Sequence, residues 1–175
     1  MTLLLDLLVV LLALFLLSTY LSWRAGRLDR LHARVDLARA GLDAALVRRA
    51  AVTLELAASR LLDPATNLVL ATAAHQARTA EPERREFAES DLSRALRAVL
   101  EQPGFREALE DEGSALLEEL ETAAQKVAFA RRFYNDAVST TRIARRRPLA
   151  RALPLAGRAP LPEFFEIDDV MPEVR

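Results

Sequence analysis

Histidine and carboxylate side chains are the groups of this sequence best suited to metal binding or acid–base catalysis. The chain contains two histidines, His32 and His75, and no cysteine. A metal site inside a helical bundle needs carboxylates together with a glutamate three residues before a histidine. Asp29 and Thr72 occupy those positions here. We therefore expect no metal site, and the lack of cysteine excludes disulfides and thiolate chemistry.

Acidic residues are dense in one part of the chain, at Glu110–Glu112 and at Glu118 and Glu119. Consecutive residues of a helix point in different directions, so these carboxylates are expected to form a solvated face and not a cation site. The sequence has no G-x-S-x-G motif, no P-loop and no glycine-rich phosphate-binding loop, and it contains five glycines in all. We expect no catalytic residues, no cofactor and no enzymatic activity.

The N-terminal segment is the element on which the rest of the chain depends. The stretch Leu3–Trp23 is apolar at nearly every position and carries one charge, Asp6. About 20 helical residues cover the roughly 30 Å hydrocarbon core of a bilayer, so residues 1–23 are predicted to be a transmembrane anchor. A secretory signal is not favoured, because no basic residue precedes the stretch and no small-x-small cleavage site follows it. Asp6 is near enough to the helix start to reach the outer interface; an intramembrane partner or ion site is the alternative.

The residues that end the apolar stretch predict its orientation. Tyr20 and Trp23 suit the aromatic belt at a membrane surface. Arginines follow immediately, at Arg24, Arg27, Arg30 and Arg34. Because positive charge is retained on the cytoplasmic side, we expect a single-pass cell-membrane protein with its N-terminus outside and its C-terminal domain in the cytoplasm.

Beyond the anchor the sequence predicts helices. Asp63-Pro64, Glu81-Pro82 and Pro103-Gly104 interrupt the helical pattern, because aspartate caps a helix and proline suits its first position. The expected fold class is all-α, with an N-terminal transmembrane helix followed by an antiparallel bundle of two long legs and two shorter middle helices. Residues 24–147 are expected to form the bundle, and residues 148–175 a proline-rich tail with apolar and acidic residues. The helices of the bundle are expected at 24–62, 64–79, 82–101 and 105–146.

Apolar residues recur at heptad spacing on both long helices. Arg49 falls within this apolar pattern on the first of them. Either its side chain snorkels to solvent or the packing surface rotates at that point. On the third helix the residues expected to face inward are Phe87, Leu92, Ala95, Leu96, Val99 and Leu100.

Charge is distributed unevenly along the bundle, because residues 81–121 are mostly acidic and residues 123–158 are mostly basic. An even number of antiparallel helices returns the fourth helix to the membrane. This would place Arg142, Arg145, Arg146 and Arg147 beside the arginines that follow the anchor. Such arginines can face anionic lipid, where each gains up to about 1 kcal/mol. The alternative is that they pair with acidic neighbours or solvate the helix.

Two segments and the tail carry a resemblance to a known family. Leu42–Arg49, LDAALVRR, resembles the LDxQLxRR segment of the LemA family, and Val127–Val138, VAFARRFYNDAV, resembles its IAxARRxYNxAV segment. Pro148 and then Phe164 and Phe165 before acidic residues are similar to that family's FP and FF ending. The matched polar positions are Asp43, Arg48, Arg49, Arg131, Arg132, Tyr134 and Asn135.

The chain also departs from the family pattern. Residues 51–56 read AVTLEL where the family has DLIPNL, Ala124 stands where the family has Glu, and the second YN is replaced near Thr140–Arg142. The resemblance implies a single-pass membrane protein with an antiparallel helical bundle. The family has no established biochemical activity, and it is encoded in some genomes near membrane metalloproteases.

The second motif segment and the tail leave alternatives open. The Tyr134 ring is expected in the core, and Asn135 can bond across to another helix as an interhelical clamp or form part of a partner-docking site. The apolar tail residues can pack along the bundle, lie in the membrane interface or engage a partner; they are Leu153, Leu155, Leu161, Phe164 and Phe165.

Together these features predict a non-enzymatic, membrane-anchored scaffold or adaptor of the LemA type. The alternative is a regulatory or accessory subunit of a membrane protease or cell-envelope enzyme. The expected partners of the chain are membrane lipid, a protein such as a membrane enzyme or protease, and a second copy of the chain in a homo-oligomer. Nucleic acid is not an expected partner, because the net charge is −1 and exposed aromatics are not interleaved with the basic residues.

Overall fold

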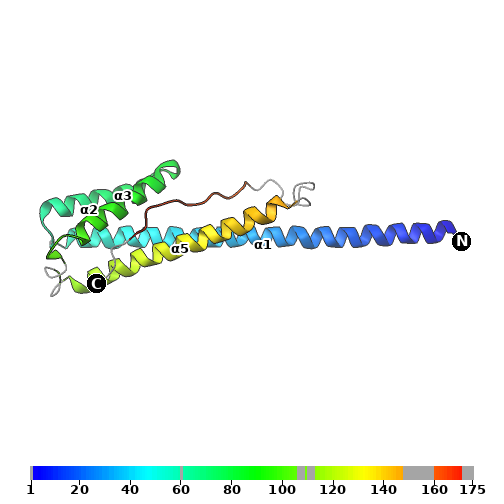
Figure 1. The fold of residues 1–175 in the computed structure, drawn as a ribbon, viewed down its shortest axis with the longest axis horizontal. Coiled ribbons are helices and arrows are strands. Elements are labelled where there is room, and N and C mark those ends of the chain that lie inside the picture. Colours follow the sequence, from blue (N-terminus) through cyan, green and yellow to red (C-terminus); the bar gives the residue numbers. More distant parts are fainter. Residues whose placement is uncertain (1, 60, 106–108, 110–112, 148–159, 171–175) are drawn as a thin grey trace. The chain divides into compact units, whose positions relative to one another are not determined.

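The computed structural model describes residues 2–59, 61–105, 109, 113–147 and 160–170 (Figure 1). Helix α1 is the longest element, α2 and α3 are short, and no strand occurs among the described residues. This confirms the predicted all-α fold with an apolar N-terminal helix and two shorter helices between two long ones. The helices are α1 (Thr2–Ala58), α2 (Pro64–Thr79), α3 (Pro82–Leu100) and α5 (Ser114–Arg146).

The boundaries of α2 follow from local chemistry. Asp63 Oδ1 accepts hydrogen bonds from the main-chain nitrogens of Ala65 at 3.0 Å and Thr66 at 3.1 Å. Pro64 occupies the first helical position, where no main-chain donor is needed. The predicted bounds of α2, residues 64–79, are confirmed.

Two boundaries differ from the prediction by more than one residue. Helix α1 ends at Ala58 instead of residue 62, and α5 begins at Ser114 instead of near Phe105. Gly104, with φ of 78°, follows α3 in a turn, and Gly113 lies close to the side chains of Leu109 and Leu61. The predicted acidic face at Glu110–Glu112 lies outside the described residues.

The chain divides into two compact units, which are described separately. The N-terminal unit comprises Met1–Leu37 and Asp136–Glu163, and the core unit comprises Ala38–Asn135 and Phe164–Arg175. In the core unit all four helices contribute to one buried apolar cluster, and burial of each large aliphatic side chain contributes about 1.5–3 kcal/mol. The larger aliphatic members of this cluster are Val52, Leu56, Leu70, Leu92, Leu96, Val99, Leu100, Leu117 and Leu120.

In the N-terminal unit, the end of α5 packs antiparallel to α1. Leu28 and Val35 of α1 and Val138 of α5 are buried. The Thr141 hydroxyl lies 3.4 Å from the main-chain oxygen of Leu31. The predicted return of the fourth helix to the residues that follow the apolar stretch is therefore confirmed.

The buried face of α3 agrees with the prediction at Leu92, Leu96, Val99 and Leu100 but not at Phe87. Phe87 is 72% exposed, whereas Glu89 and Ser93 are buried beside Leu92 and Leu96. Phe87 and Leu96 are separated by about two and a half helical turns, so they lie on opposite sides of α3. The prediction that Phe87 faces inward is wrong.

Candidate functional site

Helix α1 is long and apolar enough to span a membrane. Every large apolar side chain from Leu3 to Leu17 is more than half exposed, and none of the most apolar stretch is buried within the described structure. Water-soluble surfaces rarely carry an apolar patch of this extent. The first candidate site is therefore this apolar segment of α1, residues 3–17.

Aromatic and basic side chains end the apolar segment. The rings of Tyr20 and Trp23 lie 6.5 Å apart between centroids. Arg24 Nε donates a hydrogen bond to the Tyr20 hydroxyl at 3.0 Å, and its guanidinium carbon lies 5.4 Å from the centroid of the same ring. Such an amphipathic group suits the boundary between hydrocarbon and water.

The predicted lipid-facing arginines fall into two groups. Arg34 forms an ion pair with Asp136 at 3.4 Å, and Arg145 donates to the main-chain oxygen of Pro160 at 2.8 Å. These two arginines fasten parts of the N-terminal unit to each other. Of the other five, Arg24 bonds to Tyr20 within α1, and the exposed ones are Arg27, Arg30, Arg146 and Arg147.

Arg49 is buried, with 1% of its surface exposed, and it contacts α3. Its Nη2 atom donates to Glu89 Oε2 at 2.8 Å and to the Glu89 main-chain oxygen at 3.1 Å, and its Nη1 atom donates to Ser93 Oγ at 2.8 Å. Both predicted alternatives for Arg49, snorkelling and rotation of the packing surface, are wrong. The physical reason is that α3 supplies a buried carboxylate and hydroxyl opposite it.

Burial raises the pKa of Glu89, and the Arg49 guanidinium opposes that rise. The folded chain therefore binds this proton more tightly than the unfolded chain. The contribution of this carboxyl to stability is fully present below its unfolded pKa and is lost as pH rises through its folded pKa.

The stability difference between the native chain and a Glu89→Gln variant is expected to depend on pH for this reason. Glutamine does not titrate, so the native chain loses stability relative to the variant as pH rises above the ordinary value of 4.5. Urea unfolding of both detergent-solubilised chains, in steps from about pH 4 to about pH 7, measures the difference. A relative gain of the native chain with rising pH contradicts the expectation.

Two further motif positions form ion pairs on the surface of the core unit. Arg48 pairs with Glu119 and links α1 to α5, while Asp43 pairs with Arg85 at 3.1 Å and links α1 to α3. Pairs of this exposure contribute at most about 1 kcal/mol each. They hold helices in register and carry no reactive geometry.

Tyr134 is buried, with 3% of its surface exposed, as its predicted core position requires. Arg39 Nη1 lies 3.5 Å from the Tyr134 hydroxyl, and its guanidinium carbon lies 6.0 Å from the ring centroid. Arg132, two residues before it, is exposed.

Asn135 bonds to the C-terminal tail and not to another helix, which corrects the predicted interhelical clamp. Its Nδ2 atom donates to the Phe165 main-chain oxygen at 3.1 Å, and the Phe165 nitrogen donates to Asn135 Oδ1 at 2.9 Å. Phe165 is buried and Phe164 is 40% exposed. Arg131 forms two parallel hydrogen bonds with the Asp169 carboxylate, at 2.7 Å and 2.9 Å.

Helix α3 contacts the same part of the tail. Arg97 donates to Asp168 Oδ1 at 2.6 Å and to the Val170 main-chain oxygen at 3.0 Å. Ser90 Oγ accepts from the Asp168 nitrogen at 3.1 Å, and Glu86 Oε1 accepts from the Glu166 nitrogen at 3.0 Å. Residues 165–170 of the tail therefore pack on α3 and α5 within the core unit, while Pro148, Leu153 and Leu155 lie outside the described residues. The five contacting side chains are called the tail-docking site; they are Glu86, Ser90, Arg97, Arg131 and Asn135.

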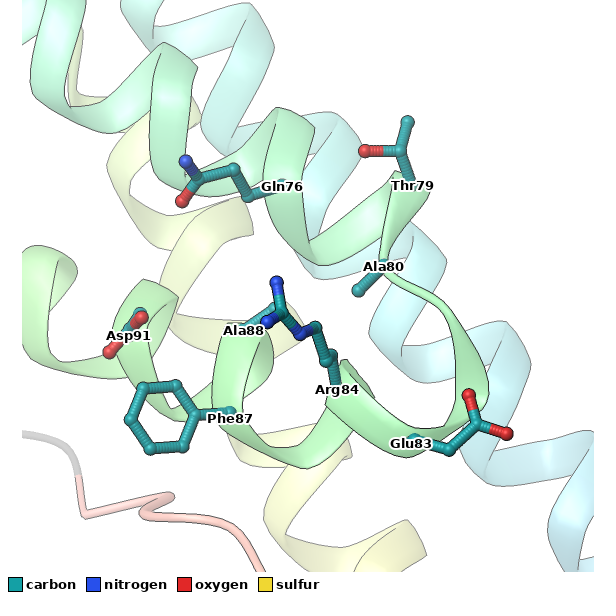
Figure 2. A pocket seen from close by; sticks show the side chains of 8 residues that line it. All are labelled: Gln76, Thr79, Ala80, Glu83, Arg84, Phe87, Ala88 and Asp91. Carbon is teal, nitrogen blue, oxygen red and sulfur yellow. The ribbon is translucent and has the colours of Figure 1, made fainter.

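A surface cavity of about 640 Å³ lies between α2 and α3. Figure 2 shows the Arg84 side chain extending into the space between these helices, with Phe87 on α3 at its edge. Glu83 and Asp91 also line it. Across the part of the chain that the structure describes, no group of three histidine or carboxylate side chains is placed to hold a metal ion.

The buried polar residues of α3 and the α3 half of the tail-docking site were not predicted from the sequence. A signal for the first was present, because Glu89 and Ser93 share the helical face of Leu92 and Leu96. No sequence signal pointed to the α3 half of the tail-docking site.

No protein-family model matches the chain, and no curated protein and no solved structure matches it either.

Proposed function

We propose that this chain is a single-pass membrane protein of the LemA family whose helical body serves as a non-enzymatic scaffold or adaptor. The observation that carries the proposal is the apolar segment of α1, which no other described element covers. Transfer of such a segment into hydrocarbon removes it from water and satisfies its main-chain groups within the helix. Tyr20, Trp23 and Arg24 then lie at one membrane surface.

The contacts of the motif residues support a structural role for the LemA-like segments. Asp43 and Arg48 link α1 to α3 and α5, and Arg131 and Asn135 link α5 to the tail. Each of these side chains fastens one element to another. Such contacts are expected of a scaffold, which positions binding surfaces and does not catalyse a reaction.

The proposed orientation places the N-terminus outside and the body in the cytoplasm. Exposed arginines follow the apolar segment and end α5, and positive charge is retained on the cytoplasmic side of membranes. Arg27, Arg30, Arg146 and Arg147 are the side chains available to anionic headgroups.

Labelling of single cysteines tests both anchoring and orientation, because the native chain has no cysteine of its own. Gln125→Cys, at an exposed position of α5, is expected to resist a membrane-impermeant maleimide in intact cells and to react after lysis. Thr2→Cys is the matched control and is expected to react in intact cells. Reaction of Gln125→Cys in intact cells contradicts the cytoplasmic assignment, and recovery of the chain in the soluble fraction contradicts anchoring.

Co-purification after mild detergent extraction distinguishes the scaffold from an accessory subunit. We expect to recover the chain as a monomer or as a homo-oligomer, and we expect the proportion of any other co-purified protein to vary with expression level. A membrane protease or envelope enzyme recovered in fixed stoichiometry, with activity that depends on this chain, identifies a regulatory subunit instead.

A further inference from the structure

We propose that the tail-docking site is a receptor for an extended peptide segment of the form Phe-x-x-Asp-Asp, and that Phe165–Asp169 of the chain itself occupies it. The partner segment belongs to another protein that this adaptor binds. This inference rests on the proposed adaptor function and names the kind of partner. Its support comes from three properties of the docked tail.

The first property is recognition of the main chain by side chains. Asn135 pairs with both main-chain groups of Phe165, Glu86 and Ser90 accept from the main-chain nitrogens of residues 166 and 168, and Arg97 donates to the oxygen of Val170. Main-chain groups are common to all residue types, so these bonds select an extended conformation without selecting most side chains. A segment from another protein can make the same bonds.

The second property is selectivity at three positions. Phe165 is the buried side chain of the docked segment, whereas Glu166 is exposed and Ile167 is only partly buried. Asp168 faces Arg97 of α3, and Asp169 faces Arg131 of α5 in a bidentate pair. A planar guanidinium matches a carboxylate in both geometry and charge. These contacts require a phenylalanine and two consecutive acids, and they leave the two intervening positions free.

The third property is that the helices form their core without the tail. The buried cluster that joins α1, α2, α3 and α5 contains no described tail residue. Residues 160–170 have no regular secondary structure, so no hydrogen-bonded ladder ties them to the bundle. The tail can therefore leave while the helical body stays folded. A tethered segment competes at an effective concentration on the order of millimolar, which keeps the site occupied by the tail until a partner is abundant or multivalent.

The test uses the purified full-length chain in detergent and a fluorescent peptide with the sequence EFFEIDDV. A chain carrying Phe165→Ala, Asp168→Ala and Asp169→Ala has an unoccupied site and is expected to bind the peptide. The native chain is expected to bind about 1,000-fold more weakly, because its own tail, at millimolar effective concentration, competes with a peptide of micromolar affinity. Adding Asn135→Ala to the tail variant is expected to abolish binding.

Two peptides and one fold measurement decide the outcome. The peptide EFFAADDV is expected to bind as well as the first, and EFFEIKKV is expected not to bind. Equal binding of the acidic and lysine peptides overturns the proposal. Loss of helical circular dichroism in the tail variant also overturns it, because the tail would then be part of the folded core.

A second measurement uses the native tail and does not depend on the triple variant. A fluorophore on Val170→Cys is expected to report displacement of the tail by excess EFFAADDV and not by EFFEIKKV. Concentration-dependent dimers of the native chain that EFFAADDV dissociates would show that the partner segment is the tail of a second copy, and would overturn the assignment to another protein. Peptide binding in detergent does not depend on topology, so its failure is distinct from failure of the anchoring test.

Discussion

Replacement of Glu89 by alanine is expected to lower the free energy of unfolding by about 3–5 kcal/mol, because it leaves the buried Arg49 guanidinium without its counter-charge. Arg49 and Glu89 are 1% and 2% exposed in their side chains, and 2.8 Å separates their charged atoms. Water cannot solvate the orphaned guanidinium without opening the contact between α1 and α3. Arg49 Nε already lacks a hydrogen-bond partner, so the site has no spare acceptor that could replace the Glu89 carboxylate.

A double replacement separates the charge effect from the loss of packing. Arg49→Met with Glu89→Leu removes both charges and keeps most of the buried volume, so it is expected to cost far less than Glu89→Ala alone. Glu83→Ala, at an exposed position of the same helix, is the matched control and is expected to change stability by less than about 0.5 kcal/mol. Urea unfolding followed by circular dichroism measures all three. A double variant that loses as much as Glu89→Ala would contradict the explanation.

The start of α2 could be predicted because its causes are local. Asp63 caps the main-chain nitrogens two and three residues after it, and Pro64 occupies the adjoining position. Every atom involved lies within one helical turn, so both the donors and the acceptor of the cap can be identified from neighbouring residues in the sequence. The same is true of the apolar stretch, where composition alone determines that water is a poor solvent for the helix surface.

The polar contacts could not be predicted because their causes are distant in sequence. Arg49 had no visible partner in its own helix, since Glu89 and Ser93 lie some 40 residues further along the chain. A buried arginine is acceptable only with a buried acceptor. The heptad position of Arg49 did not identify this acceptor, because helix packing determines which residue lies opposite it.

Asn135 of the tail-docking site also has a partner that is distant in sequence. Two alternatives were predicted for its amide, which were a bond to another helix and a partner-docking site. The observed partner is the main chain of Phe165, which any residue type could provide. Main-chain recognition leaves no mark on the sequence of the segment that is recognised, so only the structure reveals it.

Replacement of Leu11 and Leu12 by arginine is expected to release the chain from the membrane. These side chains are 56% and 57% exposed in the middle of the apolar segment, where no described element offers a counter-charge. An arginine at the centre of a membrane helix costs about 2.5–3.5 kcal/mol, so the pair costs roughly 5–7 kcal/mol. Snorkelling of the arginine side chain lowers this free-energy cost least at the centre of the bilayer, because both interfaces are then equally distant. Alkaline extraction of cell membranes measures the fraction that remains integral.

Leu37→Arg with Leu68→Arg is the matched control, because it adds the same two charges at side chains that are 75% and 68% exposed outside the apolar segment. This control is expected to stay in the membrane fraction. Both double variants are expected to keep the helical circular dichroism of the body, because neither replaces a buried side chain. Release of the control together with the Leu11 and Leu12 variant would show that added charge, and not the apolar segment, determines membrane association. Retention of both would show that residues outside this segment hold the chain at the membrane, and the exposed arginines near the end of α5 would be the first group to neutralise.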